Sequence, residues 1–235
     1  MRPDDGADPG NQILARIPSA EREAIVELAE EVVFPGRHGL FDQGDQIDRV
    51  YFPLTGMVSL VIVLRNGATV EAMTAGREGF IGVPLLHRVT TAGFKGICQV
   101  EGKFLELPAD AFLSTIVRLP ELTRRLLRYA QFSSEVLGQS AACNGMHSLQ
   151  QRCARWLLVT SDAICATNFT LTQEFLAQML AVRRSGVTVT MAALAKRELV
   201  SYKYRQVSIL DVAGLRNVAC ECYGTIKSKA ADLLA

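Results

Sequence analysis

Residues 172–194 constrain the fold of this chain more than any other segment, because they read as two short helices that meet at a sharp turn. Ala177 is small at the position where two such helices cross, and Ala181 stands where the turn usually carries glycine. Four apolar side chains are spaced to fill the crevice between the helices: Leu176, Leu180, Val182 and Val187. The pattern predicts a helix-turn-helix, with an ordinary helical hairpin as the alternative.

The second helix and the segment after it carry side chains that suit duplex DNA. Arg pairs with guanine edges in a major groove, and Ser and Thr hydroxyls contact bases or phosphates. A basic turn at residues 201–206 leads into β-prone residues, which completes the pattern of a winged helix. The candidate DNA-binding residues are Thr172, Arg183, Arg184, Ser185, Thr188, Lys203 and Arg205.

The distribution of charge supports this interpretation. Between Arg183 and Arg205 there are six Lys and Arg residues and one acidic residue, Glu198. Residues 1–120 hold 11 basic and 16 acidic residues, whereas residues 121–235 hold 14 and 8. Residues 121–235 are therefore the part of the chain expected to bind a polyanion such as DNA. A small-ligand or cyclic-nucleotide sensor that signals through protein contacts is the alternative, but it would not need this basic cluster.

Several other classes of protein are disfavoured. The longest nearly apolar run, residues 57–64, is too short to span a membrane, and the acidic N-terminus lacks the pattern of a signal peptide, so a cytoplasmic protein with no membrane partner is expected. No phosphate-cradling glycine loop, zinc-ligand pair on a helix or nucleophile elbow is found, so we do not expect an enzyme or a catalytic residue.

The cysteines and histidines give no sign of a metal site. The six cysteines form no Cys-x-x-Cys pair, and Cys220-x-Cys222 has poor spacing for a metal. His38, His87 and His147 are spread along the chain, so each is interpreted as a surface or hydrogen-bonded residue. We therefore expect no metal and no cofactor, and mostly structural thiols.

The first half of the chain reads as short antiparallel strands. All eight prolines lie at or before Pro120, and the strand candidates are residues 31–34, 40–42, 50–54, 57–64, 68–73, 96–100 and 103–107. Asn66-Gly67 is a strong signal for a two-residue hairpin turn. The pattern predicts a small barrel or jelly roll.

A long helix is expected from Pro120 to about Gly145. Apolar and small residues recur along it at alternating spacings of three and four, as in a heptad seam. The alternative is that this seam only packs on the β domain. Further apolar positions, Leu127, Ala130, Leu137 and Ala141, give the helix a second face to bury, which a coiled-coil dimer would cover. We favour a parallel homodimer, with interface residues Leu122, Leu126, Tyr129 and Val136.

The order of these parts resembles the CRP/FNR family of bacterial transcription regulators. The resemblance is most specific at residues 50–59, 76–82, 151–158 and 171–180. It implies an α+β fold with a jelly-roll-like antiparallel β-roll as sensor domain, a long dimerisation helix and a C-terminal winged helix-turn-helix. The expected limits are 1–12 for a flexible N-terminus, 13–118 for the β-roll, 119–145 for the helix and 146–235 for the DNA-binding domain. It further implies a homodimer on a palindromic DNA operator and RNA polymerase as a partner.

Departures from the family pattern concern the effector. Members that bind cyclic AMP carry a glutamate after the Phe-Ile-Gly turn, where this chain has Val83, and an Arg-Ser pair further on, which residues 90–94 lack. We therefore expect an unknown effector other than cyclic AMP. The candidate pocket residues are Arg77, Glu78, Gly82, Val83 and Arg88, with a solvated loop as the alternative role for the three charged ones. The absence of cysteines before Cys98 disfavours the iron–sulfur cluster of oxygen-sensing members.

Overall fold

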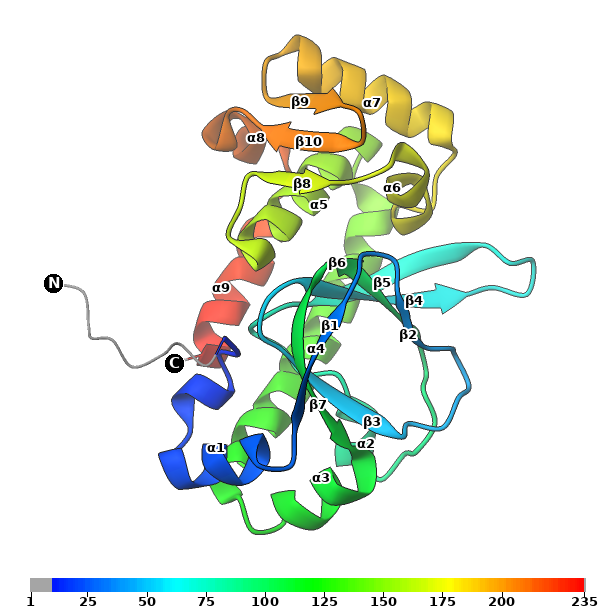
Figure 1. The fold of residues 1–235 in the computed structure, drawn as a ribbon. Coiled ribbons are helices and arrows are strands. Elements are labelled where there is room, and N and C mark those ends of the chain that lie inside the picture. Colours follow the sequence, from blue (N-terminus) through cyan, green and yellow to red (C-terminus); the bar gives the residue numbers. More distant parts are fainter. Residues whose placement is uncertain (1–9, 235) are drawn as a thin grey trace, which may run out of the picture.

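The computed structural model describes residues 10–234 and contains a β-roll, a long helix and a winged-helix domain (Figure 1). The β-roll has a three-stranded antiparallel sheet in the order β1-β7-β3 and a four-stranded one in the order β2-β6-β4-β5. Its strands are β1 (Glu30–Phe34), β2 (Gly39–Phe41), β3 (Arg49–Pro53), β4 (Met57–Val63), β5 (Thr69–Ala75), β6 (Lys95–Val100) and β7 (Gly102–Pro108). Each lies at a predicted strand position, so the predicted antiparallel β-roll is confirmed.

The hairpin between β4 and β5 shows how local sequence sets the register. Gly67 adopts a φ of +81°, and the Asn66 side-chain oxygen accepts a hydrogen bond from the Ala68 amide at 3.0 Å. The loop is one residue longer than the predicted two-residue turn, because Leu64 pairs with Ala68 and the Gly67 amide donates to the Leu64 carbonyl at 2.8 Å. Gly67 supplies the left-handed residue that closes such a three-residue loop. The strands then pair antiparallel from Val63 opposite Thr69 to Val58 opposite Ala75.

Short helices close the ends of the β-roll. They are η1 (Leu14–Arg16), α1 (Ser19–Val26), α2 (Val83–Leu86) and α3 (Ala109–Ile116). Most of the predicted flexible segment 1–12 lies outside the described residues. Asn11, however, is fully buried, and its amide donates hydrogen bonds to the carbonyl oxygens of Pro53 and Gly79. The ordered fold therefore begins before residue 13.

Helix α4 (Pro120–Met146) lies between the β-roll and the winged-helix domain (Figure 1). Pro120 occupies the first turn, where its missing amide hydrogen costs nothing. The Glu21 carboxylate accepts hydrogen bonds from the free amides of Glu121 and Leu122 at 3.2 and 2.8 Å. A long helix was predicted here, and its beginning is fixed by these contacts.

The predicted dimer seam on α4 is buried inside the chain. Leu122 and Leu126 are 0% exposed, Tyr129 is 1% exposed and Val136 is 6% exposed. They belong to a core cluster with Phe112 and other residues of the β-roll side. Each of these side chains is therefore already covered within the chain, which leaves little of its surface for a second subunit.

The winged-helix domain follows α4. Its elements are α5 (Leu149–Ile164), β8 (Asn168–Thr170), α6 (Gln173–Met179), α7 (Arg184–Lys196), β9 (Val200–Lys203), β10 (Gln206–Ile209) and α8 (Val212–Val218). The strands form one antiparallel sheet in the order β8-β10-β9. Residue Leu157 of α5, Leu176 of α6 and Leu194 of α7 are fully buried in one core with this sheet.

The last helix, α9 (Cys222–Leu234), turns back to pack on α4 (Figure 1). Its residues Ile226, Ala230 and Leu233 join Phe132 and Val136 in the core cluster of the β-roll side. The end of the chain thus returns from the winged helix to the sensor side. None of the helices between residues 10 and 234 combines the length and the hydropathy that a membrane crossing requires.

Candidate DNA-binding surface and sensor cavities

Helices α6 and α7 pack as the sequence predicted. Ala177 is 5% exposed, and Leu176, Leu180 and Val187 are nearly or fully buried between the two helices and α5. Ala181 lies in the turn with a φ of +52°, and the Val182 amide closes this turn by donating to the Ala177 carbonyl at 3.0 Å. Glycine is the usual residue at such a left-handed position. The geometry is that of a helix-turn-helix.

The first turns of α7 present an exposed face. Arg183, Arg184, Ser185 and Thr188 are exposed, while Val187, Thr190, Met191 and Leu194 point into the core. The Thr188 hydroxyl donates to the Gln173 side-chain oxygen at 2.7 Å. The four predicted residues of this helix therefore share one surface.

Val189 is the part of this surface that sequence reasoning did not select. Its side chain is 71% exposed on the same face. An apolar side chain at this position can contact the thymine methyl group in a major groove. Only its neighbours, Ser185 and Thr188, gave a signal for it in the sequence.

The wing is the hairpin of β9 and β10. Its turn residues, Tyr204 and Arg205, have φ values of +48° and +67°. Lys203, Tyr204 and Arg205 are all exposed, with Tyr204 at 97%. The wing therefore offers two cations and one aromatic ring to solvent, next to α7 in the fold (Figure 1).

Thr172 is held by both domains. It is the N-cap of α6, and its hydroxyl oxygen accepts a hydrogen bond from the Phe175 amide at 3.2 Å. The same oxygen accepts a hydrogen bond from the Arg37 guanidinium of the β-roll, which also lies over the Phe175 ring. The beginning of α6 is thus covered by the sensor domain in this conformation.

A buried polar contact also joins the two domains. The Trp156 indole of α5 donates to Glu71 of β5 at 3.0 Å, and the Gln99 amide of β6 donates to the Thr160 hydroxyl at 3.0 Å. Burial raises the pKa of Glu71 from 4.5 to about 7, against the effects of the Ser59 hydrogen bond and the Arg155 charge. The contact therefore contains a carboxyl group that titrates near neutral pH.

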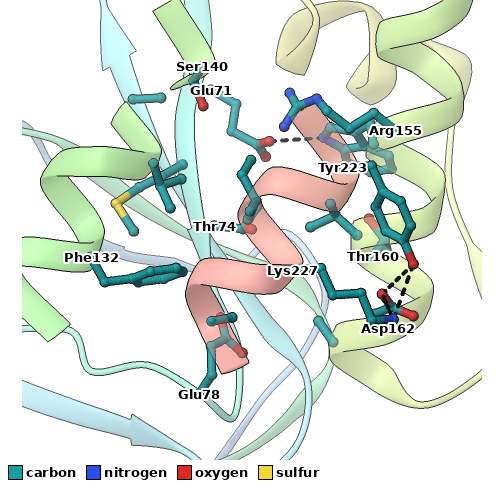
Figure 2. Close-up of a pocket in the computed structure, with 18 of the residues that line it drawn as sticks. Glu71, Thr74, Glu78, Phe132, Ser140, Arg155, Thr160, Asp162, Tyr223 and Lys227 are labelled. Carbon is teal, nitrogen blue, oxygen red and sulfur yellow. Dashed lines mark hydrogen bonds and ion pairs between the residues drawn. The ribbon is translucent and has the colours of Figure 1, made fainter. Parts of the chain in front are cut away.

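A cavity of about 390 Å³ lies beside this contact, between β5, α4, α5 and α9 (Figure 2). Figure 2 shows Glu71 near Arg155, with Asp162 bonded to Tyr223 and Lys227. The Tyr223 hydroxyl and the Lys227 ammonium reach the Asp162 carboxylate at 2.7 and 2.8 Å. This cavity is lined by both signs of charge and by residues of both domains.

A second cavity of about 240 Å³ lies between the β-roll and α4. Its wall holds no Lys, Arg, Asp or Glu among the described residues, and His87 and Tyr129 are its titratable side chains. Apolar residues such as Leu60, Met73 and Leu137 make up much of the remainder. Such a wall suits an uncharged ligand better than an anion.

The five residues predicted for the effector pocket do not meet in one place. Gly82 and Val83 line the smaller cavity, Glu78 lines the larger one, and neither wall includes Arg77 or Arg88. The Arg77 guanidinium donates to the Gly10 carbonyl at 2.6 Å. Neither arginine is therefore placed to bind a phosphate in these cavities.

Three cysteines and one histidine come together where α9 begins. The side chains of Cys143, His147, Cys220 and Cys222 have their ligand atoms within 4.8 Å of one another. The sequence interpretation treated His147 as isolated and the Cys220-x-Cys222 spacing as unsuitable. It missed this cluster because α9 returns to the end of α4, which the sequence did not indicate.

Comparison with known proteins agrees with this architecture. Residues 31–118 match the family model of the cyclic nucleotide-binding domain, and residues 151–218 match that of the Crp-like helix-turn-helix domain. The CRP-like cAMP-activated global transcriptional regulator of Mycobacterium tuberculosis (strain CDC 1551 / Oshkosh) is 25% identical over 215 residues, which cover 86% of this chain and 96% of that protein.

Solved structures share the fold. FixK2 from Bradyrhizobium japonicum aligns with a TM-score of 0.69 at 14% identity, over 82% of this chain and 98% of that one. The c-di-GMP responsive global regulator CLP from Xanthomonas campestris aligns with a TM-score of 0.65 at 14% identity, over 82% and 99%.

A cyclic-nucleotide-type β-roll, a long helix and a Crp-like helix-turn-helix together define a transcription regulator with a sensor domain. The chain belongs to the CRP/FNR family of bacterial transcription regulators.

Proposed function

We propose that this protein is a homodimeric regulator that binds a roughly palindromic operator and responds to an effector other than cyclic AMP. The observation that carries the DNA-binding part is the exposed face of α7, with Arg183, Arg184, Ser185 and Thr188 at its beginning. In this arrangement α7 enters the major groove and its first turns read base edges. RNA polymerase is the proposed partner at the promoter, and the cytoplasm is the proposed site of action.

The wing and the N-terminus of α6 are proposed to contact phosphates. Lys203 and Arg205 are exposed cations on the hairpin, and Thr172 lies at a helix N-terminus, where amide groups favour an anion. Val189 is proposed to contact a thymine methyl group.

We propose that the dimer forms through a different face of α4 from the one that the apolar spacing suggested. Seven exposed residues of this helix follow one another at spacings of three and four: Arg124, Leu127, Gln131, Ser134, Gly138, Ala141 and Gly145. Leu127 is 48% exposed, and the residues from Ser134 onward are small. Small side chains allow two helices to approach closely, and the spacing is that of a coiled-coil seam.

The domain limits that we propose are 13–118 for the sensor, 119–145 for the dimerisation helix and 146–235 for the DNA-binding domain. Helix α9 is the exception, because it packs on α4.

The proposed effector site is the smaller cavity, next to the dimer face of α4. Ala130, Ser134 and Leu137 of this helix line it. The Mycobacterium relative is named as cAMP-activated, but a cyclic phosphate in the cavity of this chain would have no cationic partner, and burying it would be costly. An uncharged, largely apolar molecule is the effector class that this wall favours.

Two experiments test the proposal. An operator is selected from random duplexes, and its affinity is measured for the wild type and for an Arg183→Ala, Arg184→Ala variant, with dimer content checked by sedimentation. We expect the dimer to persist and the affinity to fall by roughly 10-fold or more, the decrease typical of removing one to two good base contacts. Unchanged affinity would rule out α7 as the reader.

Calorimetry with cyclic AMP and cyclic GMP tests the effector assignment. We expect no binding in the micromolar range, because losing a charge-assisted partner on a buried phosphate costs several kcal/mol, or about three decades in affinity. Micromolar binding that also raises operator affinity would show that the cavity accepts a cyclic nucleotide.

A further inference from the structure

Four potential metal ligands converge from two distant parts of the chain. Cys143 lies in the last turn of α4, and His147 is the C-cap of that helix, with its backbone amide donating to the Cys143 carbonyl at 3.1 Å. Cys220 and Cys222 flank the beginning of α9. The three cysteines are at most 4% exposed, and the His147 side chain is 15% exposed.

The distances within this cluster match a single tetrahedral ion. Zinc binds thiolate sulfur at about 2.3 Å and imidazole nitrogen at about 2.0–2.1 Å, so tetrahedral geometry places two sulfurs about 3.8 Å apart and a sulfur and a nitrogen about 3.5 Å apart. The Cys143 and Cys220 sulfurs are 3.5 Å apart, and the Cys222 sulfur is 3.6 Å from His147 Nδ1. We propose that Cys143, His147, Cys220 and Cys222 form a structural zinc site.

The surroundings of the four ligands support this assignment. The Glu221 carboxylate lies 3.1 Å from His147 Nε2, which leaves Nδ1 to face the cysteines. A carboxylate on the far nitrogen is the usual partner of a zinc-bound histidine, because it fixes the ring and its tautomer. The Gln139 amide donates to the Cys222 sulfur at 3.0 Å, as amide groups do to metal-bound thiolates.

A disulfide is the other chemistry that two close cysteines can have. A bond between Cys143 and Cys220 would require their sulfurs to approach to about 2.05 Å. A disulfide would involve only two of the four side chains. It would not explain why Cys222 faces His147 or why the Glu221 carboxylate lies at the other nitrogen of that histidine. Zinc accounts for all four.

The position of the site indicates what the ion does. His147 lies at the junction of α4 and α5, so the ligands surround the point where the chain passes from the long helix into the winged-helix domain. An ion held by all four would tie α9 to this junction. Because metal binding stabilises the state that presents the ligands together, zinc should stabilise the angle at which the winged helix meets α4.

The direct test is metal analysis of the full chain, purified without an affinity tag, kept reduced, loaded with zinc and desalted. We expect one zinc per chain by plasma mass spectrometry and by native mass spectrometry. The Cys222→Ser variant should lose it, whereas Cys165→Ser, which changes an exposed cysteine outside the cluster, should keep it. Absence of zinc from the wild type, or equal zinc in both variants, would overturn the proposal.

Cobalt gives a second readout that does not depend on the folding of a variant. Co²⁺ added to the metal-free wild type should produce the strong near-ultraviolet bands of thiolate ligation and the visible bands of a tetrahedral ion. Zinc should then remove these bands by displacing the cobalt. A weak octahedral spectrum, an iron–sulfur chromophore in the purified protein, or a Cys143–Cys220 disulfide that persists in the zinc-treated protein would each contradict a zinc site.

The partner of the histidine provides a graded test. Glu221→Ala should retain the fold, because this side chain is 75% exposed, and should lower zinc affinity by about 10-fold or more in a chelator competition. Glu198→Ala, on an exposed turn of the winged helix, is the matched control and should leave zinc affinity unchanged. Equal affinity in both variants would show that Glu221 does not orient a metal-bound ring, and would count against the site.

Discussion

Glu71 of the β-roll accepts a hydrogen bond from the Trp156 indole of the winged-helix domain at 3.0 Å. Ser59 lies on the other side of the carboxyl group, 2.7 Å away, and is also 2.5 Å from the Gln99 side-chain oxygen. Ser59 has one hydroxyl proton and cannot donate it to both neighbours. A protonated Glu71 resolves this, because it donates to Ser59, which then donates to Gln99.

The stability of the domain contact should therefore fall as pH rises. The folded-state pKa of Glu71 is about 7 because of burial, above its ordinary value of 4.5, so the folded state binds the proton more tightly. Its contribution is complete below about pH 4.5 and disappears as pH rises through about 7. The upper limit is about 3 kcal/mol, from 1.36 kcal/mol for each pH unit between the two values.

Glu71→Gln should remove most of this dependence, because the amide does not ionise. Thermal unfolding of wild type and variant between pH 5 and 8 measures it, and Glu31→Gln on an exposed strand controls for loss of charge. If the melting temperatures of wild type and Glu71→Gln change with pH in parallel, Glu71 does not titrate in this range.

The turn between α6 and α7 predicts a stabilising substitution. Ala181 has a φ of +52°, which costs a non-glycine residue about 1 kcal/mol or more. Ala181→Gly should remove this strain. Glycine also increases the conformational entropy of the unfolded chain, which offsets part of the gain. We therefore expect the free energy of unfolding to rise by about 0.5 kcal/mol. Ala193→Gly, in the regular part of α7, should lower it by about 1 kcal/mol. Urea titration of both variants is the measurement, and a loss of stability at Ala181 would contradict the strain argument.

The wing should contribute charge rather than sequence preference. Lys203→Ala and Arg205→Ala should each weaken specific and non-specific DNA binding alike. Each should also reduce the slope of log affinity against log salt by about 1 for every phosphate that the variant no longer neutralises. Arg118→Ala should leave the slope unchanged, because Arg118 directly follows α3, which Figure 1 shows at the end of the molecule remote from α7. If the salt dependence of DNA affinity has the same slope in all three variants, the wing does not contact DNA phosphates.

The exposed face of α4 predicts which substitutions separate the subunits. Gly138 has open space around it, so Gly138→Arg should leave the monomer folded while blocking close approach of a second helix. Sedimentation should show a monomer for this variant and a dimer for Gly224→Arg, where a helical glycine of α9 also has open space. Leu126→Glu should instead destabilise the chain itself, because it places a carboxylate in the core. A dimeric Gly138→Arg would locate the interface elsewhere.

The sequence identified the elements whose signals are local. The strands and the pairing of α6 with α7 depend on residues a few positions apart, and the structure confirms them. The hairpin at Asn66-Gly67 is also present, but its loop is one residue longer than predicted. The face of α4 that the larger apolar side chains indicated packs within the chain, for a physical reason. Spacings of three and four occur twice around this helix, and the larger apolar side chains mark the side that packs within the chain. Small residues such as Ser134 and Gly138 carry no hydrophobic signal.

The groups that depend on tertiary structure could not be located. Cys143 and Cys220 are 77 positions apart and meet only because α9 returns to α4. The four-residue spacing of Cys143 and His147 was the one local sign of a shared site. The residues predicted for the effector pocket are also separated by the fold: Val83 lines the smaller cavity, whereas the Arg77 side chain bonds to the Gly10 carbonyl.

The contact between Arg37 and Thr172 links the sensor domain to the proposed DNA-binding surface. The guanidinium of the β-roll covers the helix end at which a DNA phosphate is proposed to bind, so the sensor domain and the operator compete for one place. Competition of this kind is reciprocal. Operator binding should therefore weaken this domain contact by the same free energy by which the contact weakens operator binding. An effector that changes the contact would change operator affinity, and the bound operator would change effector affinity by the same factor.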